Sequence, residues 1–202
     1  WFTSYSSNRT QSVYVGADHT SPSTLHCGVH QGSVIGPAEN IVYTEELDSI
    51  IRPGKFDHHM YADDIQLLSV MSLAEVPQFR SKIENCILAV RDWCSSRRLT
   101  LNPDKTELIW FASSSNLKKL QYISTNLHLE TLEIVPSSTV RDLGVYLDSS
   151  LDMHLHISKI VSAGFYHLRR LRQLRHVRNR ERRQKLVSAL ILSRVDYCNS
   201  VL

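Results

Sequence analysis

The sequence predicts an α+β fold, and three observations support this class. Short β-prone segments alternate with helical ones over the first three quarters of the chain. A long amphipathic helical pattern occupies the middle, and basic helical patterns follow from His154. We therefore expect a mixed domain at residues 1–150 and a helical domain at 151–202. With 202 residues and 42% hydrophobic content, the chain is large enough to bury a core.

The N-terminal third contains two short strand signals, at 13–15 and 25–27, with a turn-rich stretch between them. A helical pattern then runs over 33–51, and a Pro-Gly pair ends it. Apolar, β-prone runs flank the dipeptide Asp63-Asp64. This arrangement predicts a hairpin over about 56–71 with the two carboxylates at its tip.

The clearest helix follows Ser72, because Ser72 and Glu75 have the spacing of a capping box. One apolar stripe at helical period runs along this helix, which we expect to pack on the sheet. The stripe consists of Val76, Phe79, Ile83, Cys86, Ile87, Val90 and Trp93.

Beyond this helix the pattern predicts a strand at 108–111, a serine loop at 113–115, a β pair over 127–135 and a strand over 140–147. Two amphipathic helices should follow, with Asn179 as the cap of the second. The apolar positions of the first are Ile157, Ile160, Val161, Gly164, Leu168, Leu171 and Leu174. Those of the second are Leu186, Val187, Leu190 and Ile191.

The cysteines and histidines do not have metal-site spacing. The four cysteines, Cys27, Cys86, Cys94 and Cys198, form no C-x-x-C pair, so we interpret them as reduced thiols of an intracellular protein. Neither histidine pair, at 58–59 or at 154 and 156, has a clear third ligand nearby. We expect no zinc site.

The net charge of +3 hides an uneven distribution of charge. Between Lys159 and Lys185 there are ten lysines and arginines and one acid, Glu181, so this stretch carries +9 and the rest of the chain −6. Such a basic stretch suits the phosphate backbone of nucleic acids, although a solvated surface is the common alternative.

The adjacent carboxylates Asp63 and Asp64 repel each other, and a divalent cation would offset that repulsion. Mg²⁺ takes oxygen ligands and is commonly held by one or two carboxylates together with substrate phosphates. The alternative is a solvated turn, because Asp favours turns for local reasons.

Four segments in this order and spacing resemble the reverse transcriptase of non-LTR (LINE-type) retrotransposons, most closely the jockey-like branch. They are Gly28–Pro37, Tyr61-Ala62-Asp63-Asp64, Leu99–Glu107 and Arg141–Asp148. The resemblance covers essentially the whole chain. It implies part of a right-hand polymerase palm, an antiparallel sheet with packed helices, followed by an α-helical thumb. The implied activity is RNA-directed DNA synthesis, with an RNA template, a DNA primer and dNTPs as partners.

The resemblance also assigns roles to individual residues. Asp63 and Asp64 would be ligands of two Mg²⁺ ions, with Mn²⁺ as a possible substitute, and Tyr61 and Ala62 would lie beside primer and substrate. Lys105 would protonate the leaving pyrophosphate, or it is a surface lysine. The turn at the template and incoming nucleotide would be Gln31, Gly32 and Ser33, unless Ser33 only caps a helix. The primer grip would be Leu143, Gly144 and Val145.

In the basic stretch the resemblance implies contacts between a thumb and the template–primer backbone. One predicted helix carries arginines at roughly one-turn intervals, which would form a face for phosphates. The candidate residues are Arg169, Arg172, Arg175, Arg178, Arg182 and Arg183.

The chain departs from the family at His30, where proline is usual, and at Ala38-Glu39-Asn40, which replaces an apolar triplet. Glu39 and Asn40 would face the core, and each would cost about 1–3 kcal/mol if unpaired. We also expect the fingers and the strand carrying a third carboxylate to precede Trp1. The nearest acids in the chain are Asp18 and Asp57, and neither has a matching context.

These departures predict a fragment that is inactive alone. Two alternatives stay open: a non-catalytic nucleic-acid-binding remnant and the product of a decayed pseudogene. A nuclear location follows only from the resemblance. No apolar run reaches the roughly 18 residues of a membrane span, and the sequence gives no oligomeric state.

Overall fold

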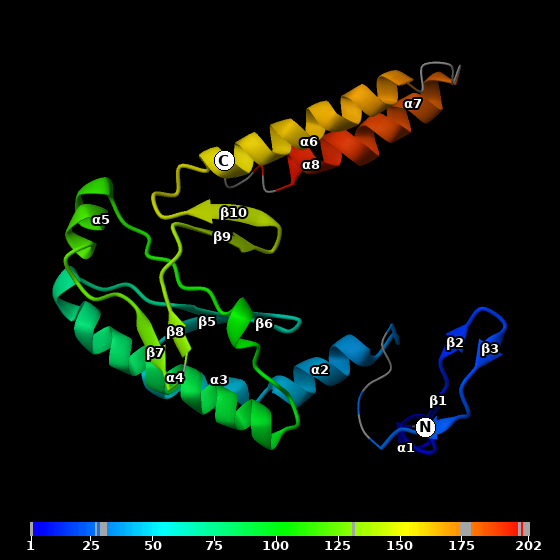
Figure 1. The fold of residues 1–202 in the computed structure, drawn as a ribbon, viewed down its shortest axis with the longest axis horizontal. Helices are drawn as coiled ribbons and strands as arrows, with labels where there is room; N and C mark the ends of the chain where they lie inside the picture. Colours follow the sequence, from blue (N-terminus) through cyan, green and yellow to red (C-terminus); the bar gives the residue numbers. More distant parts are fainter. Residues whose placement is uncertain are drawn as a thin grey trace. The chain divides into compact units, whose positions relative to one another are not determined.

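The computed structural model describes residues 2–26, 28, 32–130, 132–173, 179–197 and 199 (Figure 1). Helices and small antiparallel sheets are mixed along the chain, which confirms the α+β class. The chain divides into two compact units, Trp1–Ser69 and Val70–Leu202. The predicted domain boundary near residue 150 falls within the second unit and stays a prediction. In the described part of the chain, no helix is both long and apolar enough to cross a membrane.

Four two-residue strands follow the short helix α1 (Phe2–Ser6) in the first unit. They form two antiparallel pairs, β1 (Thr10–Gln11) with β4 (Ser23–Thr24) and β2 (Tyr14–Val15) with β3 (Asp18–His19).

The predicted strand at 13–15 is therefore confirmed in part, whereas the strand at 25–27 is wrong. Gly16 has φ 64°, a left-handed conformation that glycine adopts easily, and this turn brings β3 back onto β2. The Tyr14 and His19 rings then stack with centroids 5.3 Å apart. The last strand ends at Thr24, and Cys27 lies outside the described residues.

The single helix predicted over 33–51 is two helices, α2 (Gly36–Thr44) and α3 (Leu47–Ile51). The first helix begins at Gly36 and not at the predicted residue 33. The Ser33 hydroxyl accepts a hydrogen bond from the Gly36 N–H at 2.9 Å, a local bond that competes with the helical conformation. At the break, the Thr44 hydroxyl donates to the carbonyl oxygen of Asn40 at 2.8 Å, a side-chain bond of the kind that bends helices. A 3₁₀ turn at Arg52–Gly54 ends this segment near the predicted Pro-Gly signal.

The predicted acidic hairpin is confirmed as β5 (Asp57–Tyr61) and β6 (Asp64–Leu68). The buried apolar side chains of this unit belong to α3 and to the chain just before β5. They are Leu47, Ile51 and Phe56.

In the second unit, α4 (Val76–Ser96) is the long helix predicted from the apolar stripe. The predicted capping box is present on the 3₁₀ turn Leu73–Glu75 that leads into α4: the Ser72 N–H and hydroxyl each donate to Glu75 Oε2 at 2.7 Å. These hydrogen bonds lower the pKa of Glu75. The stripe is buried except for Phe79, which is half-buried and meets Trp110 edge-on. Cys86 and Cys94 are free and buried, and burial raises the pKa of both thiols.

The helix α4 packs against β7 (Leu127–Leu129), which pairs with β8 (Leu132–Ile134) as predicted. Two polar contacts fix this packing. Glu84 Oε1 accepts a hydrogen bond from the His128 N–H at 2.8 Å, and Arg91 binds both carboxylate oxygens of Glu130 at 2.9 and 3.1 Å. The Arg91 guanidinium also lowers the pKa of Glu130.

Three predictions between residues 108 and 147 are wrong. The segment 108–111 is not a strand, because its backbone does not pair with one neighbouring strand. The Leu108 carbonyl oxygen accepts a hydrogen bond from the Ser137 N–H. Just after the segment, the Ala112 N–H donates to the carbonyl oxygen of Ser149. The serine loop begins a helix, α5 (Ser114–Leu120). The strand over 140–147 is a hairpin of β9 (Thr139–Asp142) and β10 (Val145–Asp148), because Leu143 and Gly144 at φ 43° and 92° form a tight turn.

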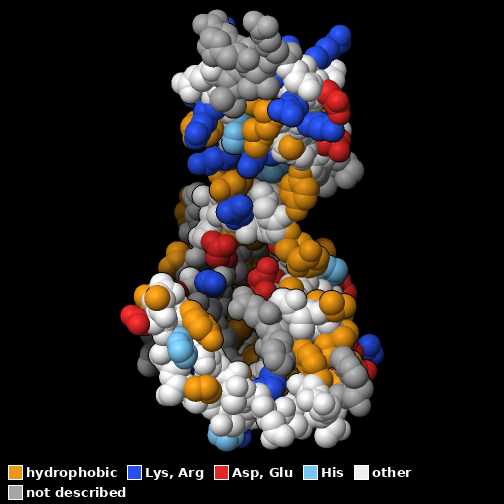
Figure 2. All heavy atoms as spheres, turned by 90° about the vertical axis from the view of Figure 1, so that its right-hand side faces the viewer, with side chains coloured by type: hydrophobic (Ala, Val, Ile, Leu, Met, Phe, Trp, Pro, Cys, Tyr) orange, Lys and Arg blue, Asp and Glu red, His pale blue; other side chains and the backbone are white. Residues whose placement is uncertain are grey.

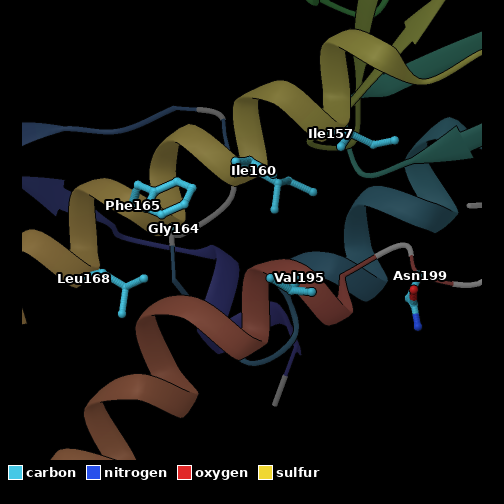
Figure 3. Close-up of a pocket in the computed structure, with 8 residues that line it drawn as sticks. Ile157, Ile160, Gly164, Phe165, Leu168, Val195 and Asn199 are labelled. Carbon is cyan, nitrogen blue, oxygen red and sulfur yellow. The ribbon is translucent and has the colours of Figure 1, made fainter.

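The helical end of the chain contains α6 (His154–Gln173), α7 (Arg180–Val187), a π-helical segment (Ser188–Leu192) and α8 (Ser193–Asp196). Asn179 caps α7 as predicted, since its side chain accepts from the N–H groups of Glu181 and Arg182. Leu174 lies outside the described residues. An apolar groove of about 290 Å³ lies between α6 and the chain around α8 (Figure 3). Its lining is Ile157, Ile160, Val161, Gly164, Phe165, Leu168, Val195 and Asn199.

Asp148 organises the connection from β10 to α6. Its carboxylate accepts hydrogen bonds from the backbone N–H groups of Ser150, Asp152 and Met153 and from the Ser150 hydroxyl, at 2.9–3.1 Å. Burial of this carboxylate raises its pKa, but the hydrogen bonds outweigh that effect and lower the pKa of Asp148 to about 2.

We predict that Asp148→Asn destabilises the second unit at neutral pH and that this difference disappears in acid. A lowered folded-state pKa stabilises the fold above the unfolded value of about 3.9. That stabilisation is lost as the pH falls towards about 2. Urea unfolding midpoints between pH 7 and pH 2 measure the effect. The control Asp104→Asn changes an exposed carboxylate of the same unit. An equal loss at every pH would contradict the role assigned to the Asp148 charge.

Candidate functional site

The two adjacent carboxylates lie at the tip of the β5–β6 hairpin. Tyr61 and Asp64 are the last paired residues, so the turn contains only Ala62 and Asp63. All four side chains are exposed. Ala62 has φ 55°, a left-handed conformation that costs a residue other than glycine about 1–2 kcal/mol. Asp63 thus occupies the turn itself, and Asp64 begins the returning strand.

A side chain of α2 contacts this turn. The Asn40 amide Nδ2 donates a hydrogen bond to the Ala62 carbonyl oxygen at 3.2 Å, across 22 residues of sequence. Asn40 is therefore paired, and the cost expected of an unpaired side chain does not apply to it. Its neighbour Glu39 differs, because Glu39 Oε2 is buried without a hydrogen-bond partner among the described residues.

The other end of the hairpin is joined to α3 through Asp48. Asp48 Oδ1 lies 3.3 Å from His58 Nε2 on β5, and Asp48 Oδ2 lies 2.6 Å from the Arg52 Nε. Sequence reasoning missed Asn40 and Asp48 as contacts of the hairpin. No local signal in the sequence indicates such pairs, since their partners are set by the tertiary fold.

The donor set at the tip fits a hard divalent cation. Two carboxylates can hold Mg²⁺ while water and substrate phosphates complete its coordination. Asp57 is at the far end of β5, about 14 Å from Tyr61 at a rise of about 3.4 Å per residue. Asp18 lies in β3. Over the described ranges, no group of three or more His, Cys, Asp or Glu side chains is arranged to hold a metal.

The predicted template-contacting turn precedes α2. Gly32 has φ 78°, and its neighbour Ser33 bonds to the Gly36 N–H. The hydrogen bond of Ser33 is the one expected of a helix-start residue, so both interpretations of this segment stay open. Gln31 lies outside the described residues. This turn leads directly into α2, the helix whose Asn40 contacts the acidic tip. Gly36, the first residue of α2, lies four residues before Asn40, which is about 6 Å along the helix axis.

The remaining predicted residues belong to the second unit. Lys105 is exposed and ends a short 3₁₀ turn that Asn102 caps. Leu143 and Gly144 form the β9–β10 turn, and Val145 begins β10 and is buried. The Tyr197 hydroxyl donates to the Leu143 carbonyl oxygen at 2.6 Å, and a Cβ added to Gly144 would lie 3.5 Å from the Tyr197 ring.

The predicted basic residues that the structure describes are exposed on α6 and α7. They are Arg169, Arg172, Arg182 and Arg183, whereas Arg175 and Arg178 lie outside the described residues. Figure 2 shows lysine and arginine side chains gathered over these helices.

Two further cations lie close to the ring of Tyr146 on β10: Lys159, which begins the predicted basic stretch, and Arg141, which was not predicted. The Arg141 guanidinium is 5.7 Å and the Lys159 ammonium 6.0 Å from the ring centroid. Positive charge therefore extends from α6 to the β9–β10 hairpin.

Comparison with known proteins gives two matches. The family model described as reverse transcriptase (RNA-dependent DNA polymerase) matches residues 2–147. A protein of Drosophila melanogaster described as a probable RNA-directed DNA polymerase from transposon BS is 30% identical over 183 residues, 88% of this chain. The match covers only 19% of that protein, so the chain spans about a fifth of its length. No solved structure matches.

We predict that Tyr197→Phe weakens the β9–β10 turn. The substitution removes the hydroxyl that donates to Leu143 and keeps the ring beside Gly144. We expect the free energy of unfolding to fall by about 0.5–1 kcal/mol and amide exchange at residues 143–145 to accelerate. Urea unfolding and hydrogen exchange measure both effects. As the control, Tyr122→Phe removes a hydroxyl from a side chain that is 90% exposed. Equal effects of the two substitutions would refute the proposed contact.

Proposed function

Because the chain belongs to the reverse transcriptase (RNA-dependent DNA polymerase) family, we propose that it is the part of a retrotransposon polymerase that carries the metal-binding turn. Residues 1–150 would form part of the palm and residues 151–202 part of the thumb. The observation that carries this proposal is the exposed pair Asp63 and Asp64 on a two-residue hairpin turn. The parent element would be of the non-LTR type, because the four motifs occur together in order.

Asp63 and Asp64 would hold Mg²⁺, or Mn²⁺ in its place. When bound, the metal supplies activation of the primer 3′-hydroxyl and stabilisation of the leaving pyrophosphate. The chain's own part is to present two charged oxygen donors outside its core, where substrate phosphates can reach them. The small side chain of Ala62 leaves space beside the acids, and Tyr61 is exposed to pack against substrate.

Other residues would bind and orient the substrates. Gly32 and Ser33, with Gln31, would approach the templating base and the incoming dNTP. Lys105 would donate a proton to the leaving pyrophosphate as a general acid. The turn of Leu143, Gly144 and Val145 would hold the primer terminus.

The exposed arginines of α6 and α7 would bind the backbone of an RNA template paired with a DNA primer. Two features support this role. The stretch from Lys159 to Lys185 has a net charge of +9, and the arginines that are described in it are exposed. A nuclear location would suit an enzyme that copies RNA into genomic DNA.

A second candidate function is nucleic-acid binding without catalysis. The basic helices and the acidic turn belong to different units, so binding does not require an intact metal site. Glu39 Oε2 is buried without a hydrogen-bond partner among the residues that are described, next to the contact between α2 and the turn, which favours the non-catalytic candidate.

We predict that any primer extension by the chain on an RNA template with dNTPs and Mg²⁺ is lost in Asp63→Ala. Duplex affinity should stay within about twofold, because the phosphate contacts are assigned to arginines elsewhere. Gel-based extension and fluorescence anisotropy on one primer–template measure the two properties. If the unsubstituted chain extends the primer and Asp63→Ala binds the duplex without extending it, the result supports the polymerase function. Absence of extension in the unsubstituted chain, with binding retained, would show a chain that binds the duplex but does not copy it, as expected of a fragment that is inactive alone. Collapse of binding in Asp63→Ala contradicts the assignment of separate roles.

We predict that the double variant Arg169→Gln and Arg172→Gln weakens duplex binding and lowers the slope of log affinity against log salt by about 2. Each arginine would neutralise one phosphate of the duplex, and the counterions condensed on that phosphate would be released, which sets the salt slope. Anisotropy titrations between 50 and 200 mM salt give the slope. Lys118→Gln removes an exposed charge on α5 and should leave the slope unchanged. The same slope in all three proteins would exclude these arginines from the interface.

A further inference from the structure

We propose that Asn40 is a positioning residue that sets the orientation of the Asp63–Asp64 turn. This inference rests on the proposed function of the two acids. It starts from one contact, the hydrogen bond from Asn40 Nδ2 to the Ala62 carbonyl oxygen at 3.2 Å.

This hydrogen bond acts on the backbone at the point where Asp63 begins. A peptide unit is planar, so the Ala62 carbonyl, the Asp63 N–H and the Asp63 Cα move together. A donor that holds the carbonyl oxygen therefore also restrains the positions of the Asp63 N–H and Cα, from which the Asp63 side chain extends.

The turn needs such a constraint. Ala62 has φ 55°, and strained residues persist only where their surroundings hold them. The pair Tyr61 and Asp64 closes the turn on one side. Asn40 adds a second point of attachment, from a residue that is half-buried within α2 and thus held by a helix.

The chemistry of the donor also suits a metal site. The Asn40 amide is neutral and donates to a backbone oxygen, so it leaves the oxygens of Asp63 and Asp64 available to a cation. A lysine or arginine at position 40 would instead form ion pairs with the acids and compete with the metal. Asn40 departs from the family but would then have a function, whereas Glu39 Oε2 beside it has no hydrogen-bond partner in the described part of the chain.

The test compares Asn40→Leu with the control Glu39→Gln, which changes the adjacent side chain of the same helix. The first readout is amide exchange at Asp63 and Asp64 by NMR. Loss of one hydrogen bond should accelerate it roughly threefold to tenfold in Asn40→Leu and leave Glu39→Gln unchanged. A second variant, Asn40→Asp, keeps the volume but replaces the amide with an acceptor-only group, and it should accelerate exchange as well. Thermal melting checks that each variant folds.

The second readout is Mn²⁺ alone, titrated into the chain and detected by paramagnetic broadening of the Asp63 and Asp64 signals. Asn40→Leu should weaken this binding by the same roughly threefold to tenfold factor, at an unchanged melting temperature. A general loss of structure would instead lower the melting temperature and broaden signals throughout the unit.

The two proposals fail in different ways. If broadening in the unsubstituted chain does not depend on Asp63, as judged with Asp63→Asn, the metal-binding function is wrong, and the exchange comparison still decides the role of Asn40. If folded Asn40→Leu and Asn40→Asp exchange at the turn like Glu39→Gln, the positioning role is wrong. If exchange accelerates while the affinity for Mn²⁺ stays the same, Asn40 holds the turn without affecting the metal site, and the proposal is also overturned.

Discussion

A two-residue turn is the constraint on which the candidate site depends. The register of β5 and β6 leaves only Ala62 and Asp63 unpaired, so the strand pairing itself places one acid in the turn and the next at the start of β6. The β9–β10 turn has the same construction, with Leu143 in a left-handed conformation. In both turns a remote side chain donates to the carbonyl of the first turn residue: Asn40 in one and Tyr197 in the other.

Each unit contains one such turn and helices that contact its hairpins. In the first unit α2 and α3 contact the tip and the other end of the acidic hairpin through Asn40 and Asp48. In the second, α4 packs on the β7–β8 hairpin, while α6 packs on β10 and carries part of the basic surface. The proposed chemical roles would be divided accordingly: oxygen donors for a cation in one unit and positive charge for phosphates in the other.

The sequence predicted the elements whose signals are local. The acidic hairpin, the capping box at Ser72 and Glu75, and the Asn179 cap each depend on residues a few positions apart, and the structure confirms them. The strand expected at 108–111 failed because its backbone partners come from distant segments, which an apolar pattern does not identify. The contact of Asn40 was missed for the same reason. The residues proposed for the site came from motif resemblance, whereas the groups that hold them emerged only from the fold.

The left-handed conformation of Ala62 also restricts which residues could replace it in related copies of the element. Glycine, asparagine and aspartate adopt positive φ at little cost, whereas β-branched residues are outliers there. Genomic copies that drift without selection would acquire valine or threonine at this codon as readily as elsewhere. Copies whose protein is still used would be restricted to the few tolerant residues. Related copies with a β-branched residue at this codon are therefore expected to have lost the hairpin.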